Sequence, residues 1–194
     1  MKMRVGVLAL QGAFIEHQKS LAECGCEPVQ IRKKEELASI HGLVIPGGES
    51  TTIGKLLVDF ELMDPVIKMA RAGKPIFGTC AGLIVMSKEI ENSAQHRLGL
   101  MDITVRRNAF GRQVDSFETE LSIPEIGPEP FKAVFIRAPY IYKTGSDVQV
   151  LATYEGKTVF ARQGNLLVSS FHPELTPDIR IHQYFISLIK ESQK

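Results

Sequence analysis

The feature that most constrains the fold is a series of short strand-like runs, separated by helix-like segments, in the first half of the chain. Residues 5–10 are continuously apolar, and shorter runs follow at 29–31, 43–46 and 75–77. Continuous apolar runs are typical of strands covered on both faces, and strands that alternate with helices indicate βαβ units in a parallel sheet. Helices are predicted for residues 13–24, 52–60, 65–72 and 81–90.

The second half of the chain has strand-like runs with few helices between them. These runs occupy residues 103–105, 117–121, 133–136, 148–154, 159–161 and 166–170. They predict antiparallel strands added to the sheet. A last helix is expected to start at Pro177 with Thr176 as its N-cap. Its buried face is expected to carry Ile181, Phe185, Leu188 and Ile189. No linker or repeat divides the chain, so we expect a single α/β domain over residues 1–194 with a mixed, mainly parallel sheet.

Charge and cysteine content limit the class of protein. A formal net charge of +1 on 194 residues gives no field that would attract nucleic acid or an anionic membrane. No stretch is long enough to span a bilayer, and Gln11 and Gly12 end the apolar N-terminal run before any signal-peptide cleavage site. The three cysteines, Cys24, Cys26 and Cys80, indicate neither a disulfide framework nor a zinc site. We therefore expect a cytoplasmic protein with no metal and no cofactor.

Cys80 lies in the sequence Gly78-Thr79-Cys80-Ala81-Gly82, between a predicted strand and a predicted helix. G-x-C-x-G is the thiol counterpart of the G-x-S-x-G nucleophile elbow. A sharp turn there strains the central residue and crowds the positions two residues away, and glycine relieves that crowding. The helix N-terminus then favours a thiolate, and the N–H of Ala81 points where an oxyanion forms. The alternative is a structural cysteine buried between two glycines, so a catalytic interpretation requires a base.

A candidate base follows the last predicted strand, in the sequence His172-Pro173-Glu174. Pro173 favours an extended His172, and in an extended segment residues two apart project to the same side. The Glu174 carboxylate can therefore orient the imidazole and leave its other nitrogen for Cys80. A surface turn is the alternative for this tripeptide alone, but with Cys80 it provides a nucleophile, a base and an orienting group. The other histidines, in predicted helices or connecting segments without such a carboxylate, are His17, His182, His41 and His96.

The segment PGGES at residues 46–50 follows the third predicted strand. A Walker phosphate loop is excluded, because the spacing from Gly48 to Gly54 is one residue too long and Leu56 stands where a hydroxyl is required. A glycine pair at a strand end can instead turn backbone N–H groups toward a neighbouring site. We interpret this pair as a second oxyanion donor.

Six motifs carry a family resemblance. They are LALQGAF at 8–14, PGGEST at 46–51, FGTCAGL at 77–83, RRNAFGRQ at 106–113, FIRAP at 135–139 and SFHPEL at 170–175. In this order and spacing, PGGEST, FGTCAGL and SFHPEL resemble the triad class of glutamine amidotransferases. The other three narrow the resemblance to the glutaminase subunits of pyridoxal phosphate synthase, the vitamin B6 biosynthetic enzyme. The resemblance implies a class I glutamine amidotransferase-like fold, a three-layer α/β sandwich with a flavodoxin-like core.

The resemblance also implies roles for individual residues. Cys80 would attack the side-chain amide of L-glutamine through a thioester, His172 would protonate the departing ammonia and Glu174 would orient His172. Backbone at Gly47-Gly48 and at Ala81 would hold the oxyanion. The positions that match the family's glutamine-binding residues are Gly48, Glu49, Ser50, Arg107, Ile136 and Arg137.

The chemistry of these side chains agrees with a free amino acid as substrate, because arginine pairs with an α-carboxylate and glutamate with an α-ammonium. Arg137 is the lone charge in the apolar run 134–139, and it either pairs inside the site or reaches solvent. Arg106 and Arg107 are adjacent and project to opposite faces of a strand. Only the motif position selects Arg107 over its neighbour.

The resemblance implies a partner. Ammonia released into neutral water becomes protonated and is no longer a nucleophile, so it must pass to an acceptor site on another chain. The implied acceptor is a (β/α)-barrel synthase subunit that forms a hetero-oligomer with the glutaminase. Gln11 matches a residue placed near the oxyanion loop and the contact with that synthase. A movable Gly47-Gly48 loop would explain activation on docking.

Two other functions stay open from the residues alone. A cysteine hydrolase or peptidase of similar α/β fold would cleave other amides and show no preference for glutamine. A catalytically silent regulatory subunit would not need an intact nucleophile. Glu174 beside His172, together with Glu49 and Arg137 as ligands for a free amino acid, favours the glutaminase.

Overall fold

The protein's structure is a computed structural model that describes residues 2–107 and 116–194. Among these residues, ten strands form a central sheet: β1 (Arg4–Leu8), β2 (Glu27–Ile31), β3 (Gly42–Ile45), β4 (Ile76–Thr79), β5 (Ser87–Ile90), β6 (Met101–Arg106), β9 (Tyr140–Thr144), β10 (Gln149–Tyr154), β11 (Lys157–Gln163) and β12 (Leu166–Ser169). Their order across the sheet is β2-β1-β3-β4-β12-β11-β9-β6-β5, and β10 pairs with β11 at the side of this path.

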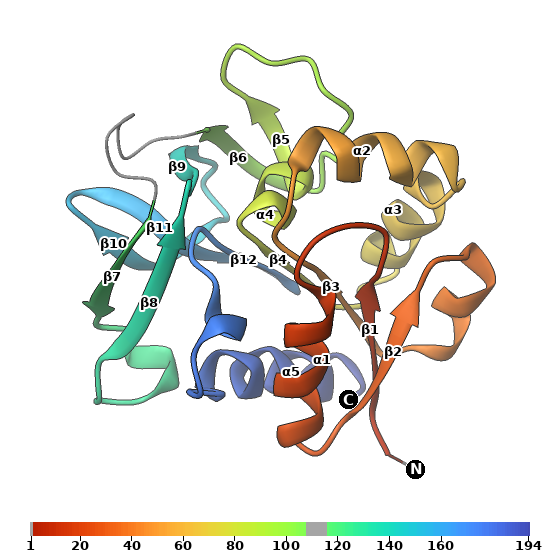
Figure 1. Ribbon diagram of the computed structural model, residues 1–194, viewed down its shortest axis with the longest axis horizontal. Coiled ribbons are helices and arrows are strands. Elements are labelled where there is room, and N and C mark those ends of the chain that lie inside the picture. The colour runs from red at the N-terminus through yellow and green to blue at the C-terminus, as the bar shows by residue number, and fades with distance from the viewer. Residues whose placement is uncertain (1, 108–115) are drawn as a thin grey trace.

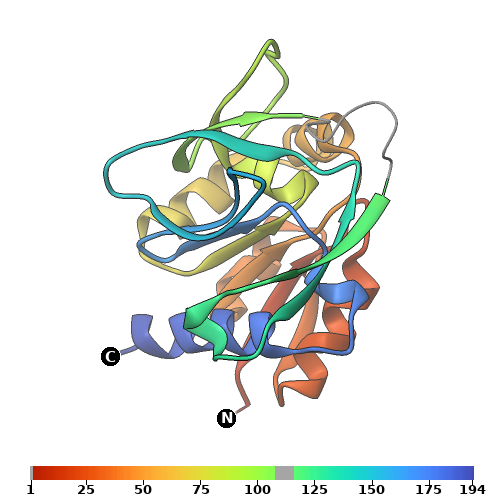
Figure 2. The same cartoon turned by 90° about the vertical axis from the view of Figure 1, so that its left-hand side faces the viewer.

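Helices cover both faces of the sheet. They are α1 (Phe14–Glu23), α2 (Ser50–Asp59), α3 (Met63–Arg71), α4 (Ala81–Met86) and α5 (Arg180–Ser192), with 3₁₀ turns η1 (Lys34–Ser39), η2 (Pro124–Ile126) and η3 (Pro173–Leu175). Helices α1 and α5 lie against one face, and α2, α3 and α4 against the other (Figures 1 and 2). The predicted α/β fold with three layers is therefore confirmed.

The strands β2, β1, β3, β4 and β12 are all parallel. Successive residues of a strand point to opposite faces, so a strand between two helical layers must be apolar throughout. In β3, Leu43 and Ile45 belong to the core beneath α2, α3 and α4, whereas Val44 belongs to the core beneath α1 and α5. This arrangement explains the continuous apolar runs in the first half of the sequence.

The second half adds antiparallel strands, as predicted: β11 pairs antiparallel with β12, β10 and β9, and β6 pairs antiparallel with β9. One pair differs from the prediction, because β7 (Ser116–Leu121) and β8 (Phe131–Ile136) form a separate two-stranded sheet. The inward face of β8 explains this, since Phe131 and Phe135 are fully buried and their rings lie 5.7 Å from that of Phe171. The two-stranded sheet of β7 and β8 thus packs over the core as a separate layer (Figure 2).

The helix predicted for residues 81–90 is shorter than expected. It ends at Met86, and Ser87–Ile90 forms β5, parallel to β6. Ser87 has extended backbone angles, and its hydroxyl donates to the carbonyl of Ile84 at 2.7 Å, which closes the end of the helix. Strand β9 was not predicted from the sequence.

The start of the last helix was also predicted wrongly. Thr176 does not cap it, because its hydroxyl donates to the carbonyl of Pro173, and the helix begins at Arg180. The Asp178 carboxylate accepts the N–H of Arg180 at 3.0 Å, so this side chain satisfies a free N–H of the first turn. The predicted buried face of the helix is confirmed, since Ile181, Phe185, Leu188 and Ile189 are all fully buried.

The apolar N-terminal run forms the buried strand β1. No helix in the part of the chain that the structure describes is both long enough and apolar enough to cross a membrane. Cys24, Cys26 and Cys80 are all free thiols.

Candidate active site

Cys80 is the single residue between β4 and α4, and its backbone is strained, with φ 50° and ψ −102°. Its N–H donates to the carbonyl of Ser169 at 2.8 Å, which fixes the turn to β12. The flanking glycines are needed, because a Cβ on Gly78 would lie 2.7 Å from the backbone of Gly82, and one on Gly82 would lie 2.0 Å from the carbonyl oxygen of Ile45. The predicted sharp turn between strand and helix, and its steric requirement for glycine, are confirmed.

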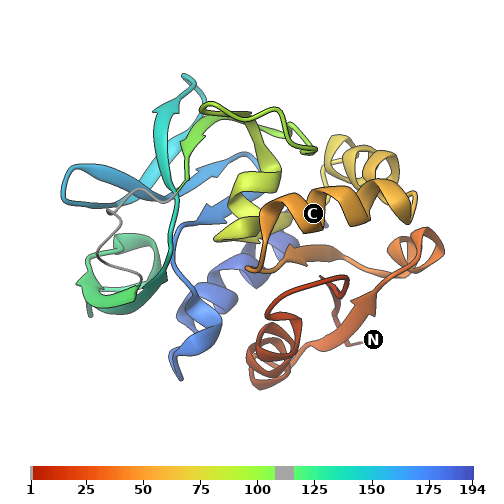
Figure 3. The same ribbon diagram turned by 45° about the horizontal axis from the view of Figure 1, so that its top comes forward.

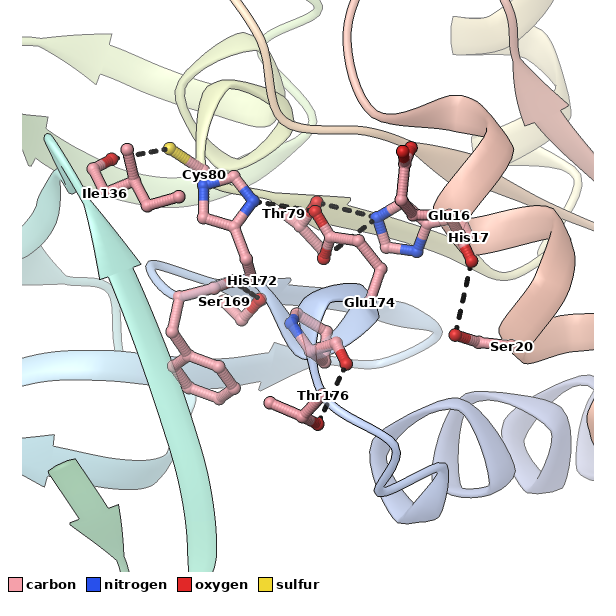
Figure 4. Close-up of polar contacts among 12 residues, drawn as sticks. Glu16, His17, Ser20, Thr79, Cys80, Ile136, Ser169, His172, Glu174 and Thr176 are labelled. Atoms are coloured by element: carbon pink, nitrogen blue, oxygen red, sulfur yellow. Dashed lines mark hydrogen bonds and ion pairs between the residues drawn. The ribbon is translucent and has the colours of Figure 1, made fainter. Parts of the chain in front are cut away.

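His172 reaches Cys80 from the neighbouring strand. Strands β12 and β4 are parallel with Ser169 opposite Thr79, so the residues that follow each strand meet at one edge of the sheet. The His172 ring lies beside the Cys80 side chain (Figure 4), whose sulfur donates to the carbonyl of Ile136 at 3.8 Å. The backbone N–H of His172 donates to the carbonyl of Val134 at 2.8 Å, which ties the segment to β8.

Glu174 lies on the far side of the imidazole. Its Oε1 is 2.7 Å from Nδ1 of His172, and both side chains are buried. The contact was predicted, but its geometric reason was wrong: residues 173–175 form the 3₁₀ turn η3 rather than an extended segment. The turn folds the carboxylate back onto the ring, so the proximity arises from a tight turn and not from strand alternation.

Neighbouring polar groups determine the charge of this pair. Burial alone lowers the pKa of His172, but its interactions with Cys80 and Glu174 outweigh burial and raise that pKa to about 10. Burial raises the pKa of Glu174, and the facing rings of His17 and His172 outweigh it and lower that pKa. At neutral pH the histidine is therefore a cation that is held by a carboxylate and lies next to the sulfur of Cys80.

A cavity of about 590 Å³ opens above Cys80 and His172. Its size lies within the usual range for small-molecule sites. The predicted site residues that line it are Gly47, Gly48, Glu49, Ser50, Cys80, Ala81, Arg107, Ile136, Arg137 and His172. Glu174 lies behind His172 and Gln11 lies beside the cavity, so neither belongs to its wall. Among the described residues, no group of three or more histidine, cysteine or acidic side chains could hold a metal ion.

The glycine pair is held by the loop that follows β1 (Figure 3). The carbonyl of Gly47 accepts the N–H of Ala13 at 3.0 Å, and the N–H of Glu49 donates to Oε1 of Gln11 at 2.7 Å. A Cβ on Gly48 would lie 2.3 Å from Oε1 of Gln11, so a larger residue there would displace the Gln11 side chain. Gln11 therefore contacts the glycine pair directly, where the resemblance placed it.

The carboxylate of Glu49 caps helix α2. It accepts the N–H groups of Thr51 and Thr52 and both of their hydroxyls. Burial raises its pKa, but these bonds together outweigh burial and lower the pKa to about 2. A negative charge is thus fixed at the cavity rim, and capping is a second role that the sequence did not reveal.

The two candidate arginines are separated by the structure. Arg106 turns away and pairs with Glu91, with Nη2 at 2.6 Å from Oε1, whereas Arg107 lines the cavity. The motif position therefore selected the arginine at the site. Residues 108–113 of the same motif lie outside the described residues. Arg137 follows the end of β8 with a positive φ of 43°, so it belongs to a turn at the cavity rather than to the strand.

Sequence reasoning missed Gln95. Its Oε1 accepts Nη1 of Arg107 at 3.0 Å and the hydroxyl of Ser50 at 3.4 Å, so it connects two predicted substrate ligands. It lies between β5 and β6, in a segment with no motif, and nothing local in the sequence points to it. Sequence reasoning also set His17 and His182 aside, but both are fully buried behind the triad.

Comparison with known proteins gives consistent matches. The model of the SNO glutamine amidotransferase family matches residues 7–191. The chain is 64% identical to the "Pyridoxal 5'-phosphate synthase subunit PdxT" of Pelotomaculum thermopropionicum, over 95% of this chain and 94% of that protein. It is 61% identical to the subunit of the same name from Desulforamulus reducens, over 97% of this chain and 100% of that protein.

Solved structures agree. A structure described as "Crystal structure of glutamine amidotransferase" matches with a TM-score of 0.92 and 50% identity, over 96% of this chain and 98% of that one. A structure described as "Structure of PurLQS from Thermotoga maritima" matches with a TM-score of 0.73 and 16% identity, over 96% of this chain and 99% of that one. The second match shows likeness of fold alone.

Proposed function

The chain belongs to the SNO glutamine amidotransferase family, and from this premise we propose that Cys80, His172 and Glu174 hydrolyse L-glutamine to L-glutamate and ammonia. The protein is the glutaminase subunit of a pyridoxal 5'-phosphate synthase, and relatives that are 64% and 61% identical over nearly the whole chain are named as subunits of that synthase. The observation that carries the proposed chemistry is the buried array in which Cys80 contacts His172, and His172 contacts Glu174 at 2.7 Å.

The reaction proceeds in two stages. The Cys80 thiolate attacks the side-chain amide carbon of glutamine, and the carbonyl electron pair moves onto oxygen. The tetrahedral intermediate collapses with cleavage of the C–N bond, while the His172 imidazolium gives its proton to the departing nitrogen, which leaves as ammonia. A glutamyl thioester remains on Cys80. His172 then accepts a proton from water, the resulting hydroxide attacks the thioester, and glutamate leaves with regeneration of the thiolate.

Backbone groups hold the oxyanion in this proposal. The N–H of Ala81 lies at the N-terminus of α4, next to the reacting sulfur. The Gly47-Gly48 segment faces it across the cavity, and it is bonded to Ala13 on one side and Gln11 on the other. A change in the loop that carries Gln11 would therefore change the backbone near the oxyanion, which is how docking of the synthase would activate the enzyme.

The substrate's amino acid end fits the charged part of the cavity. Arg107 and Arg137 provide positive charge for the α-carboxylate, and Glu49 provides negative charge for the α-ammonium. Ser50, Gly48 and the backbone of Ile136 complete the wall. A peptide has no free α-carboxylate and α-ammonium on one residue inside the chain, so these charges favour a free amino acid over a protein substrate.

The partner in this proposal is a synthase subunit with a (β/α)-barrel fold that receives the ammonia in a hetero-oligomer. The relatives' names describe each of them as a subunit of the synthase, which supports such a partner. The three free thiols support a reducing compartment such as the cytoplasm. In this proposal residues 1–194 form a single glutamine amidotransferase domain.

Ammonia and glutamate release from L-glutamine, with and without the synthase subunit, tests this proposal. We expect glutamate and ammonia in equal amounts, a large increase when the synthase is added, and no cleavage of peptides. Full activity of the isolated chain would contradict activation by docking. Peptide cleavage without a preference for glutamine would favour a cysteine peptidase, and no turnover in either form would favour a silent subunit.

A further inference from the structure

A polar cluster is buried behind Glu174, between α1, α5 and β4. His17 from α1 and His182 from α5 are both 0% exposed, and Nδ1 of His17 lies 2.9 Å from Nε2 of His182. Nε2 of His17 lies 3.0 Å from the hydroxyl of Thr79 and 3.4 Å from Oε2 of Glu174. Figure 4 shows the His17 ring directed at the carboxylate of Glu174, on the side opposite His172. Burial of this many polar groups lowers the stability of the fold unless the groups form hydrogen bonds with one another.

The carboxylate of Glu174 favours one direction for the hydrogen bonds of His17. An ionised Glu174 only accepts, so a proton is favoured on Nε2 of His17, which faces both Oε2 of Glu174 and the nearer hydroxyl of Thr79. Nδ1 of a neutral His17 then accepts the N–H of His182 Nε2. Nδ1 of His182 is left as a bare lone pair, which agrees with its having no hydrogen-bond partner among the described residues. His182 therefore selects the tautomer of His17 that can donate to Glu174.

The opposite protonation state is disfavoured. A cationic His17 would force His182 to accept at Nε2 and to bury an unpaired N–H at Nδ1. Burial also lowers the pKa of His17, and burial with the neighbouring His17 lowers that of His182 to about 3. The titratable groups that act on His17 are Glu174 and His172 from the segment after β12, His182 from α5 and Glu16 on its own helix. Both buried histidines are thus neutral at pH 7.

We infer that His17 is a positioning residue for glutamine hydrolysis: its Nε2–H holds the second oxygen of Glu174, so that the first oxygen is aligned with His172. The inference rests on the proposed function of the triad. Oε2 of Glu174 is buried and has no hydrogen-bond partner among the described residues, and Nε2 of His17 lies 3.4 Å from it. Catalytic hydrogen bonds are often long in the free enzyme and shorten in the reacting complex.

The position of His17 also connects the triad to the proposed docking region. Helix α1 begins directly after the loop of Gln11, Gly12 and Ala13, which holds the glycine pair. His17 lies in the first turns of that helix and points inward to η3. One short segment therefore contacts the oxyanion loop at one end and the orienting carboxylate at the other.

Three substitutions of His17, measured in the complex with the synthase subunit, test the inference. His17→Gln keeps an N–H where Nε2 lies, His17→Asn keeps a polar group only where Nδ1 lies, and His17→Phe keeps the ring without any hydrogen bond. His41→Gln is the matched control, because His41 lies before β3 at the end of the sheet away from the site. The readouts are kcat, KM for glutamine, the pH profile of kcat and the melting temperature.

We expect kcat to fall at least about tenfold in His17→Phe and His17→Asn, with KM for glutamine within about twofold, because His17 does not touch the substrate. Loss of the donor raises the pKa of Glu174, so the acidic limb of the profile moves to higher pH in these two variants. His17→Gln should restore most of the lost kcat, and His41→Gln should resemble the wild type within about twofold.

Two results would overturn the inference. One is an unchanged kcat and pH profile in His17→Phe, while the wild type hydrolyses glutamine. The other is an equal loss of kcat in all three variants with a parallel loss of melting temperature, which would assign His17 a packing role. A wild type that does not hydrolyse glutamine would instead contradict the proposed function, so the two failures are distinguishable.

Discussion

Nδ1 of His172 and Oε1 of Glu174 lie 2.7 Å apart in a region where the two residues are 7% and 6% exposed. Solvent cannot provide the hydrogen bond that this carboxylate provides. The carboxylate therefore fixes the orientation of the ring, which leaves its other nitrogen for Cys80, and it stabilises the positive charge of the ring. In the proposed mechanism, the reactivity of Cys80 therefore depends on a group that does not touch the substrate.

Replacement of Glu174 tests this dependence. In Glu174→Gln the shape is kept, but the charge is lost and the amide can hold the wrong tautomer of His172. We expect kcat for glutamate production in the complex to fall by at least about a hundredfold, with a smaller change in KM. Glu120→Gln, on the exposed side of β7, is the control. Near wild-type turnover of Glu174→Gln would show that the carboxylate does not orient the base.

The charge of His172 can be measured directly by NMR titration of its ring. The wild-type pKa is raised to about 10, so the imidazolium persists well above the ordinary value of 6.5 and is lost only as the pH approaches 10. In Cys80→Ala the interaction of the ring with the sulfur, which raises the pKa of His172, is missing, so the ring should lose its proton at a lower pH. A wild-type ring that titrates near pH 6.5, or an unchanged titration in Cys80→Ala, would contradict this coupling.

Gln95 is predicted to position the substrate ligands. Gln95→Ala removes the acceptor that holds Arg107 at 3.0 Å and Ser50 at 3.4 Å, so these side chains lose a common anchor. We expect KM for glutamine to rise about fivefold or more, with a smaller effect on kcat. Gln163→Ala, which removes the same kind of acceptor from the N–H of Asp102, is the control and should leave KM unchanged. Equal KM values for both variants would exclude the anchor role.

Gly82 is predicted to be essential for the elbow. A Cβ there would lie 2.0 Å from the carbonyl oxygen of Ile45, and neither atom can move without disturbing β3 or α4. We expect Gly82→Ala to lower the free energy of unfolding by more than about 2 kcal/mol. Gly164→Ala meets no atom within 4 Å but has a φ of +57°, so it should cost only about 1 kcal/mol. Chemical denaturation measures both, and an equal effect of the two would contradict the steric argument.

The triad could be predicted because its parts are local. Gly78 to Gly82 carry the steric requirements of the elbow within five residues, and Glu174 is two residues from His172. The apolar runs at 75–77 and 166–170 also predicted the two strands, β4 and β12, that precede Cys80 and His172 at one edge of the sheet. The contact between His172 and Glu174 was predicted correctly, although the predicted backbone conformation was wrong. Both an extended segment and a 3₁₀ turn bring residues i and i+2 close together.

The groups that were missed depend on contacts between distant segments. His17 and His182 are 165 positions apart, and each alone is a histidine on a helix. Gln95 meets Arg107 and Ser50 only after three separate elements have packed together. The separate β7–β8 sheet likewise results from the burial of Phe131 and Phe135 against Phe171, which no local pattern specifies.

The most direct test of the account is the site of covalent reaction. A chloroketone analogue of L-glutamine, added to the complex and followed by mass spectrometry of intact chain and peptides, reports which cysteine is the nucleophile. We predict a single adduct on Cys80, prevented by excess L-glutamine and absent from Cys80→Ala, which should also make no glutamate. Modification of Cys24 or Cys26 in place of Cys80, or continued glutamate production by Cys80→Ala, would contradict the central claim.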